Sequence, residues 1–204
     1  MSKNITVVGV GKLGLGLALL IEKAGYKVLG VDINKEYVDK LNDKTFKTTE
    51  PEYENLLKNS KNFTVTTDLK EGLNFSDYIY ILVQTPNGGG RNFYDHTILS
   101  NLLYKINSYK PKNKHFIIGC TVMPKYLDTI AKELIKDCDN SNLLYNPEFV
   151  AQGEIIKGFS NSSIILIGCN TKSVNTEPIS KLMDIYTNMG HDMRKIKIMS
   201  LLES

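Results

Sequence analysis

The sequence predicts an α/β protein built on a doubly wound, mostly parallel sheet with helices on both faces. Short β-branched runs alternate with longer segments of helical periodicity, which is the pattern of parallel strands joined by crossover helices. The strand runs are almost wholly apolar, as strands buried on both faces are. Near the N-terminus one strand leads through closely spaced glycines directly into an apolar helix.

The expected elements follow one another at regular spacing. The strands are expected at 4–8, 27–31, 62–66, 78–83, 115–120 and 163–168. The helices, several of which start with Pro or a capping residue, are expected at 13–24, 35–42, 95–108, 124–136 and 171–189. The longest irregular stretches are 84–93 and 145–159, and loops that follow strands usually carry the sites of α/β folds.

Composition indicates a folded protein with one domain. The chain has 204 residues, of which 42% are hydrophobic and 23% charged, and no internal repeat or flexible linker divides it. We therefore expect a single domain over 1–204. The net charge of +3 comes from scattered lysines rather than a basic stripe, so no nucleic-acid partner is expected.

Cysteine usage and hydropathy favour a cytoplasmic location. Cys120, Cys138 and Cys169 have no paired spacing, so neither a disulfide framework nor a thiolate metal site is indicated, and the histidines fall in unrelated segments. No signal-peptide pattern opens the chain, and its longest apolar stretch, 15–21, is shorter than the roughly 20 residues that a membrane helix needs. We expect no metal and no membrane partner.

The glycines near the N-terminus form a dinucleotide-binding fingerprint. Gly9, Gly11 and Gly14 occur as Gly-x-Gly-x-x-Gly between a strand and a helix. The first permits the tight turn, the second lets the backbone approach a pyrophosphate, and the third lets helix and strand pack closely. The free N–H groups of the helix N-terminus would then face the pyrophosphate. This context predicts a Rossmann-type fold.

An acidic residue at the end of the next strand specifies the cofactor. Asp32 stands close to the spacing of about 20 residues at which a carboxylate meets the ribose hydroxyls. A carboxylate there accepts hydrogen bonds from both hydroxyls of NAD and repels the 2′-phosphate of NADP, so NAD is the expected cofactor. The alternative is that the three glycines serve only the turn and that Asp32 caps a loop.

Six tags along the chain resemble the nucleotide-sugar dehydrogenases, the family that includes UDP-glucose 6-dehydrogenase and GDP-mannose dehydrogenase. The tags are Gly-Val-Gly-Lys-Leu-Gly-Leu at 9–15, Val-Asp-Ile-Asn at 31–34, Glu-Pro at 50–51 followed by Leu-Leu at 56–57, Val-Gln-Thr-Pro at 83–86, Cys-Thr-Val-Met-Pro at 120–124, and Tyr-Asn-Pro-Glu-Phe at 145–149 with Gly153. Their order and gaps match the family. The Asn-Pro-Glu-Phe tag resembles the UDP-glucose and GDP-mannose branch more than the dehydrogenases of N-acetylated sugars.

The resemblance implies roles for individual residues. Thr121 resembles the threonine between nicotinamide and substrate that holds a catalytic water, and Glu148 resembles the glutamate assigned to acid/base work in thioester hydrolysis. These two are the candidate catalytic residues. The cofactor-binding candidates are Gly9, Gly11, Lys12, Leu13, Gly14, Asp32, Thr85, Pro86, Thr121 and Gln152. The alternative is that Thr121 merely ends a strand and Glu148 caps the following turn.

Four positions depart from the family pattern. Gln152 stands where a second glutamate is usual, Tyr37 where a basic residue is common, Cys120 where a serine is usual, and Gln84 where proline or asparagine is common. Gln152 can hydrogen-bond but cannot accept a proton as a carboxylate does. A water held there would lose one base.

The resemblance also implies that part of the family's machinery lies outside this chain. The family's connecting helix, with its lysine and asparagine, and its second domain, with a Gly-Gly-x-Cys motif, have no counterpart in 1–204. The four-electron oxidation of C6 of a nucleotide sugar to a uronic acid, a step of polysaccharide biosynthesis, needs that thiolate. We therefore expect an N-terminal NAD-binding half that does not turn over alone, and leave open whether the chain is itself an enzyme.

Two other functions stay open at this level. The chain could be a non-enzymatic NAD-binding or regulatory module, or a different dehydrogenase of the wider Rossmann group, which the Asn-Pro-Glu-Phe tag disfavours. Without the connecting helix, the segment 196–202 is expected to expose an apolar patch. Self-association or pairing with a C-terminal half is therefore expected, with a nucleotide sugar as substrate of the complete enzyme.

Overall fold

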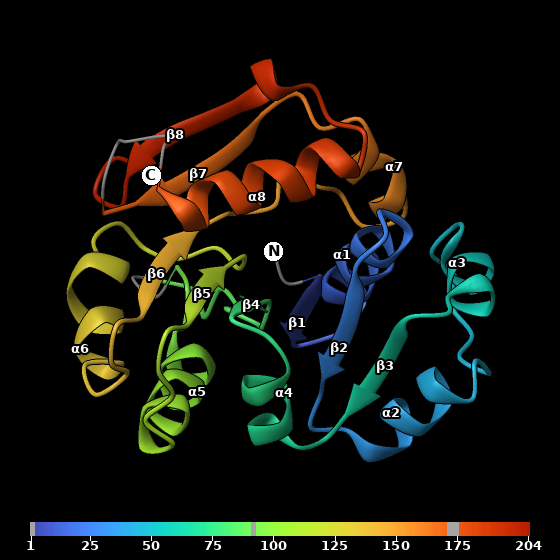
Figure 1. The fold of residues 1–204 in the computed structure, drawn as a ribbon, viewed down its shortest axis with the longest axis horizontal. Coiled ribbons are helices and arrows are strands. Elements are labelled where there is room, and N and C mark those ends of the chain that lie inside the picture. The colour runs from blue at the N-terminus through green and yellow to red at the C-terminus, as the bar shows by residue number, and fades with distance from the viewer. Residues whose placement is uncertain (1–2, 91–92, 171–175) are drawn as a thin grey trace.

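The computed structural model describes residues 3–90, 93–170 and 176–204, which contain one eight-stranded sheet with strand order β3-β2-β1-β4-β5-β6-β7-β8 (Figure 1). The strands are β1 (Asn4–Val8), β2 (Lys27–Val31), β3 (Phe63–Thr66), β4 (Tyr78–Ile81), β5 (His115–Ile118), β6 (Asn142–Tyr145), β7 (Ile165–Cys169) and β8 (Ile196–Ser200). The helices are α1 (Lys12–Lys23), α2 (Lys35–Asn42), α3 (Tyr53–Asn59), α4 (Leu69–Phe75), α5 (Thr97–Ser108), α6 (Lys132–Leu134), α7 (Ile155–Ser160) and α8 (Glu177–Asn188), with a π-helical turn η1 (Leu127–Ala131) and a 3₁₀ turn η2 (Met193–Lys195).

The sheet confirms the predicted Rossmann-type fold. Its first six strands have the order 3-2-1-4-5-6 and are all parallel, which is the doubly wound arrangement of dinucleotide-binding proteins. β7 runs antiparallel to β6, and β8 is parallel to β7. The connections change direction between β1 and β4. Ligands of such sheets bind beyond the carboxyl ends of the strands at this switch point.

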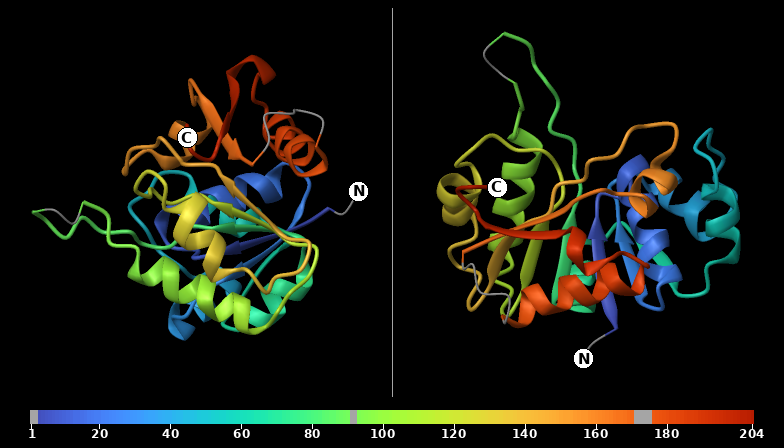
Figure 2. Two further views of the ribbon diagram at one scale, coloured as in Figure 1. Left: turned by 90° about the vertical axis from the view of Figure 1, so that its left-hand side faces the viewer. Right: turned by 90° about the horizontal axis from the view of Figure 1, so that it is seen from above.

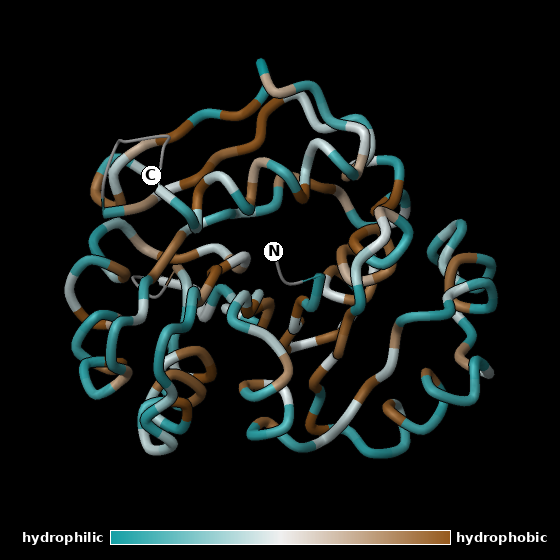
Figure 3. Tube along the Cα trace, in the orientation of Figure 1, coloured by the Kyte–Doolittle hydropathy of each residue, from teal (hydrophilic) through white to brown (hydrophobic). Residues whose placement is uncertain are grey.

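The core consists of two apolar layers, one on each face of the sheet. Buried side chains of α1, α3, α7 and α8 pack on one face, and those of α4, α5 and η1 pack on the other. In Figure 2, α1 and α8 lie on one side of the strands and α5 on the other. Hydrophobic colour follows the central strands and the inner sides of the helices (Figure 3). Helices on both faces are therefore confirmed.

Several elements differ from the predicted ones. Helices α3, α4 and α7 and strands β6 and β8 were not expected from the sequence, because four to seven residues are too few to display a periodicity. The predicted helix 124–136 forms only the turns η1 and α6. Lys125 has a φ of 71°, a left-handed conformation that no helix interior accepts, so the helical turns begin beyond it. The start of the predicted helix 171–189 lies outside the described residues.

The prediction of an exposed apolar patch at 196–202 is mostly wrong. The segment forms β8, whose Ile196 and Ile198 pack against the core, and Leu201 is buried. Leu202 alone among its large apolar side chains is well exposed, at 59%. Pairing with β7 and packing on the core leave most of these apolar side chains half-buried. Within the described ranges, no helix is both long and apolar enough to cross a membrane.

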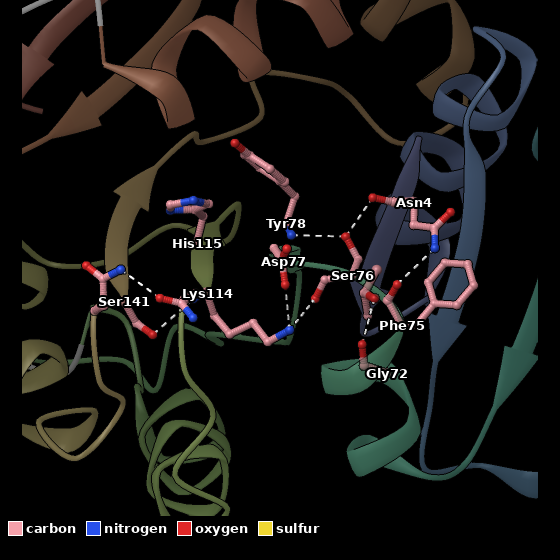
Figure 4. A network of polar contacts seen from close by, with 12 residues as sticks. Asn4, Gly72, Phe75, Ser76, Asp77, Tyr78, Lys114, His115 and Ser141 are labelled. Carbon is pink, nitrogen blue, oxygen red and sulfur yellow. Dashed lines mark hydrogen bonds and ion pairs between the residues drawn. The ribbon is translucent and has the colours of Figure 1, made fainter. Parts of the chain in front are cut away.

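A polar network closes the amino-terminal edge of the sheet (Figure 4). The nearly buried Lys114 donates from Nζ to the carbonyl oxygen of Ser76 at 3.1 Å and to Oδ1 of Asp77 at 2.8 Å. Ser76 in turn donates from Oγ to the carbonyl oxygen of Asn4 at 2.6 Å. These contacts join the starts of β1, β4 and β5. They occupy the edge opposite the strand ends at which a ligand is expected.

We expect Phe116→Ala to destabilise the protein by about 3–5 kcal/mol, because the ring is fully buried on β5 and its removal leaves a cavity. Urea unfolding followed by circular dichroism measures the change. Tyr104→Ala is the control, since that ring is 68% exposed on α5 and should cost little. Equal losses for the two variants would contradict the described core.

Candidate cofactor and reaction site

Five of the predicted site residues lie at one edge of the sheet. Because β1, β2, β4, β5 and β6 are parallel, their carboxyl ends meet at the same edge. Gly9, Asp32, Thr85, Thr121 and Glu148 follow these five strands within one to four residues. The topology therefore brings together residues that are spread over 140 positions of the sequence.

The glycines of the fingerprint differ in what requires them. Gly9 has a φ of 86°, and a Cβ there would lie 2.5 Å from the carbonyl oxygen of Leu82 on the neighbouring chain segment. A Cβ on Gly14 would lie 1.9 Å from the carbonyl oxygen of Gly9, so only glycine lets α1 pack this close. Gly11 has no atom within 4 Å of its would-be Cβ. The space beside Gly11 is open, so a ligand phosphate can approach the protein backbone there.

The N-terminus of α1 is arranged to bind an anion. No side chain caps the helix at Gly11, so the first N–H groups of α1 have no side-chain acceptor there. The carbonyl oxygens of the same loop are occupied from behind: Tyr37 donates to that of Val10 at 2.7 Å, and Tyr53 donates to that of Lys12 at 2.6 Å. With these carbonyl oxygens occupied, the N–H groups at the start of α1 remain as donors for an anion such as a pyrophosphate. Lys12 is exposed.

Asp32 is held at the end of β2. Its N–H donates to the carbonyl oxygen of Thr66 at 3.1 Å, and its Oδ1 accepts from the N–H of Asn34 at 3.1 Å. The side chain is half-buried, which leaves carboxylate oxygen lone pairs for a ligand. Burial, and secondarily the charge of Asp32, raises the pKa of the neighbouring Tyr37 well above its ordinary value. Tyr37 therefore stays a neutral donor.

Thr121 and Glu148 occupy equivalent places on adjacent strands. Ile118 of β5 pairs with Tyr145 of β6. Thr121 follows Ile118 by three residues, and Glu148 follows Tyr145 by three residues. Thr121 is exposed and Glu148 is half-buried. Thr85 is half-buried in the loop after β4, which is the expected side of the nicotinamide in this fold.

The remaining predicted cofactor residues also lie near this edge. Leu13 packs against the core from the first turn of α1, whereas Pro86 and Gln152 are exposed in the loops after β4 and β6. The carbonyl oxygen of Pro86 accepts from the N–H of Asp95 at 2.8 Å, which fixes the base of the long loop between β4 and α5. In Figure 2 the described parts of this loop project from the body of the domain.

Glu148 does not serve as a cap for its turn. Its Oε1 lies 3.1 Å from the hydroxyl oxygen of Tyr186, which comes from α8. Burial raises the pKa of Glu148 to about 8, and a hydrogen bond donated by Tyr186 would lower it. A carboxyl group with a pKa near neutrality is suited to proton transfer. No motif in the sequence connects α8 to this site, because Tyr186 lies 38 residues from Glu148 in the chain.

Glu50 is a second residue whose role the sequence did not reveal. Its carboxylate is 5% exposed, and both of its oxygens accept from the N–H of Gly153, at 2.9 and 3.1 Å. This contact joins the segment before α3 to the loop that carries Glu148 and Gln152. The Glu-Pro tag marked the position, but nothing in the sequence says that a carboxylate there is buried, since the partner lies 103 residues away.

The cysteines and the acidic groups offer no further centre. All three cysteines are free and buried, and burial raises the pKa of both Cys120 and Cys138 to about 11. Such thiols are inert at neutral pH. The residues that the structure describes contain no group of three His, Cys, Asp or Glu side chains able to hold a metal ion.

Comparison with known proteins defines the class of this site. The profile of the "UDP-glucose/GDP-mannose dehydrogenase family, NAD binding domain" matches residues 3–190. The chain belongs to this family, and the matched part is the domain that binds NAD.

Individual relatives point the same way. The chain is 33% identical over 178 residues to UDP-N-acetyl-D-mannosamine dehydrogenase of Methanocaldococcus jannaschii, covering 85% of this chain and 40% of the relative. It is 27% identical over 177 residues to GDP-mannose 6-dehydrogenase of Pseudomonas aeruginosa, covering 81% and 40%. The chain therefore spans about 40% of the length of these relatives.

Solved structures agree on the fold. The structure superposes on GDP-mannose dehydrogenase of Pseudomonas aeruginosa with a TM-score of 0.83 at 22% identity, covering 98% of this chain and 47% of that one. It superposes on the UDP-N-acetyl-mannosamine dehydrogenase of Staphylococcus aureus with a TM-score of 0.79 at 27% identity, covering 97% and 47%. Both matches run over nearly the whole of this chain.

We expect Gly14→Ala to destabilise the protein by about 1–3 kcal/mol, because the new Cβ would overlap the backbone of Gly9. Gly11→Ala is the matched control in the same loop. Its φ of −60° suits alanine and its Cβ meets nothing, so its free energy of unfolding should be unchanged. Denaturant unfolding of both variants decides the point, and a stable Gly14→Ala protein would refute the close packing of α1.

Proposed function

We propose that this chain is the NAD-binding N-terminal half of a nucleotide-sugar dehydrogenase, with the cofactor lying across the N-terminus of α1. The observation that carries the proposal is the convergence of an uncapped helix N-terminus, Asp32 and the pair Thr121 and Glu148 at one sheet edge. Asp32 binds the adenosine ribose, and Gly9, Gly11, Lys12, Leu13 and Gly14 surround the pyrophosphate. Thr85, Pro86 and Gln152 line the nicotinamide side.

In the complete enzyme, NAD held at this edge would supply the hydride acceptor for oxidation of the sugar at C6. Thr121 presents an exposed hydroxyl that orients a water or the substrate, and Glu148 supplies a group able to exchange a proton near neutral pH. Gln152 can orient the same water through its amide but cannot take its proton. Glu148 is therefore the proposed acid/base group on the loop after β6.

The sugar stays a prediction. The Asn-Pro-Glu-Phe tag favours UDP-glucose or GDP-mannose, whereas the relative at 33% identity acts, by its name, on UDP-N-acetyl-D-mannosamine. Three free cysteines fit a reducing compartment, which supports a cytoplasmic location for the proposed reaction. A single domain over 1–204, paired with a C-terminal half that supplies the reactive thiol, is the arrangement we propose.

A non-enzymatic NAD-binding module is the second candidate. The observation that favours it is the state of the three thiols, all of which are buried, because the family's chemistry requires a reactive thiolate. The two candidates differ in what a C-terminal half should do. A dehydrogenase gains activity when that half is added, whereas a module does not.

Replacing Asp32 should weaken the preference for NAD over NADP. We expect Asp32→Ala to raise the Kd for NAD about tenfold or more, because hydrogen bonds to a charged group contribute about 1.5–3 kcal/mol. The same change removes the repulsion of the 2′-phosphate, so the affinity for NADP should rise relative to that for NAD. Isothermal titration with each cofactor measures both.

Asp39→Ala is the matched control for this substitution. It removes the same charge from α2, where the Asp39 carboxylate forms an exposed ion pair with Lys35 at 2.8 Å. Its cofactor affinities should equal those of the unchanged protein. If both variants weaken NAD equally, the effect is one of net charge and Asp32 has no specific contact.

The chain by itself should bind NAD without reducing it. Incubation with NAD and UDP-glucose, GDP-mannose or UDP-N-acetylmannosamine should give no NADH absorbance, because the lysine, asparagine and reactive thiol that the family resemblance implies for the reaction have no counterpart in residues 1–204. The complete Methanocaldococcus jannaschii relative serves as the positive control for the assay. Production of NADH by this chain alone would disprove the assignment as a half-enzyme.

A further inference from the structure

The hydrogen bonds around Glu148 identify which atoms carry protons. The orientation of the Asn146 side-chain amide is fixed first. Asn146 is 1% exposed and directly follows β6. Its Nδ2 donates to the carbonyl oxygen of Leu166 at 2.9 Å. A carbonyl oxygen can only accept, so the amide cannot be turned over, and Oδ1 must face the other way.

The second proton belongs to Tyr186 on α8. Its hydroxyl lies 2.6 Å from Oδ1 of Asn146, and an amide oxygen can only accept. Tyr186 therefore donates its single proton to Asn146, at the length of a strong O–H···O bond. The tyrosine ring is 2% exposed and its centre lies 5.5 Å from that of His191, so the hydroxyl is held in place.

These two assignments decide which group donates in the contact between Glu148 and Tyr186. Oε1 of Glu148 lies 3.1 Å from the same hydroxyl oxygen, which has no proton left to donate. Two acceptors facing each other in a buried place would be unfavourable, whereas a protonated carboxyl group donates to the free lone pair of the hydroxyl. We propose that Asn146, acting through Tyr186, holds Glu148 in its protonated form at neutral pH.

The surroundings of Glu148 support the same state. Tyr186 of α8 and Tyr80 of β4 are the titratable groups that the described structure brings to it, and both are neutral donors whose pKa burial raises further. The hydroxyl of Tyr80 is fully buried and has no hydrogen-bond partner among the described residues. Neither tyrosine supplies a positive charge to stabilise a carboxylate. Burial is the leading cause of the raised pKa of Glu148, about 8.

The functional consequence rests on the proposed function. In this state the single carboxyl proton is donated to Tyr186, so the other carboxyl oxygen can only accept a hydrogen bond from a substrate hydroxyl. Glu148 can act as a base only after it has released that proton. Asn146 and Tyr186 are thus positioning residues that set the starting protonation state. The ionisation of Glu148 itself does not depend on any substrate, so it can be tested in this chain even if the assigned reaction is wrong.

Carbon-13 NMR of the Glu-labelled chain measures the proposed state. The Glu148 carboxyl signal, identified by its loss in Glu148→Gln, should titrate with a midpoint well above the ordinary value of 4.5. Asn146→Ala frees the Tyr186 proton to stabilise the carboxylate, so it should raise the acid dissociation constant of Glu148 at least about tenfold, one pH unit. Tyr186→Phe removes the acceptor for the carboxyl proton and should also lower the midpoint.

Asn142→Ala is the matched control, because it removes an exposed amide from the start of the same strand, next to His115. It should leave the Glu148 midpoint unchanged. A midpoint near 4.5 in the unchanged chain, or a higher midpoint in Tyr186→Phe, would overturn the proposal, since the latter means that Tyr186 donates to the carboxylate.

Unfolding gives a second readout, which stays informative if Asn146→Ala folds poorly. The folded pKa of Glu148 lies above the unfolded value, so its protonation contributes stability that is fully present below about 4.5 and is lost as the pH rises through about 8. The unchanged chain should lose stability relative to Glu148→Gln across this window. Parallel pH profiles for the two proteins would contradict the proposal.

Discussion

The close approach of α1 to the end of β1 is the constraint on which the site depends. Gly14 lies against the backbone of Gly9, and Gly9 lies against that of Leu82 after β4. This packing occurs at the switch point of the sheet. It therefore fixes the position of the α1 N-terminus relative to the carboxyl ends of the strands on either side. A side chain at Gly9 or Gly14 would displace the helix, and with it the N–H groups that face an anion.

Two tyrosines extend this constraint to the loop itself. Tyr37 from α2 and Tyr53 from α3 bind the carbonyl oxygens of Val10 and Lys12, and thereby fix which way the peptide units point. Tyr37 stands where the family commonly has a basic residue. In this chain the position contributes a half-buried hydroxyl donor to the loop instead of a charge.

The two carboxylates at the strand edge are prepared for different tasks by their surroundings. Asp32 accepts from a backbone N–H and keeps oxygen lone pairs available, as recognition of ribose hydroxyls requires. Glu148 faces two buried tyrosines and no cation among the described residues, which favours its neutral form. The same residue chemistry thus yields a fixed acceptor at one end of the edge and a titratable acid at the other.

The sequence by itself determined the fold class, five of the six parallel strands and the cofactor, because buried parallel strands and the Gly-x-Gly-x-x-Gly turn are local patterns that survive in any folded context. It also gave the positions of Asp32, Thr121 and Glu148, but not their environments. The short elements α3, α7 and β8, the burial of Glu50 against Gly153, and the contact of Tyr186 with Glu148 were decided only by the tertiary structure. Each of these joins residues far apart in the chain, and the protonation of a carboxyl group depends on what surrounds it in space rather than on its neighbours in sequence.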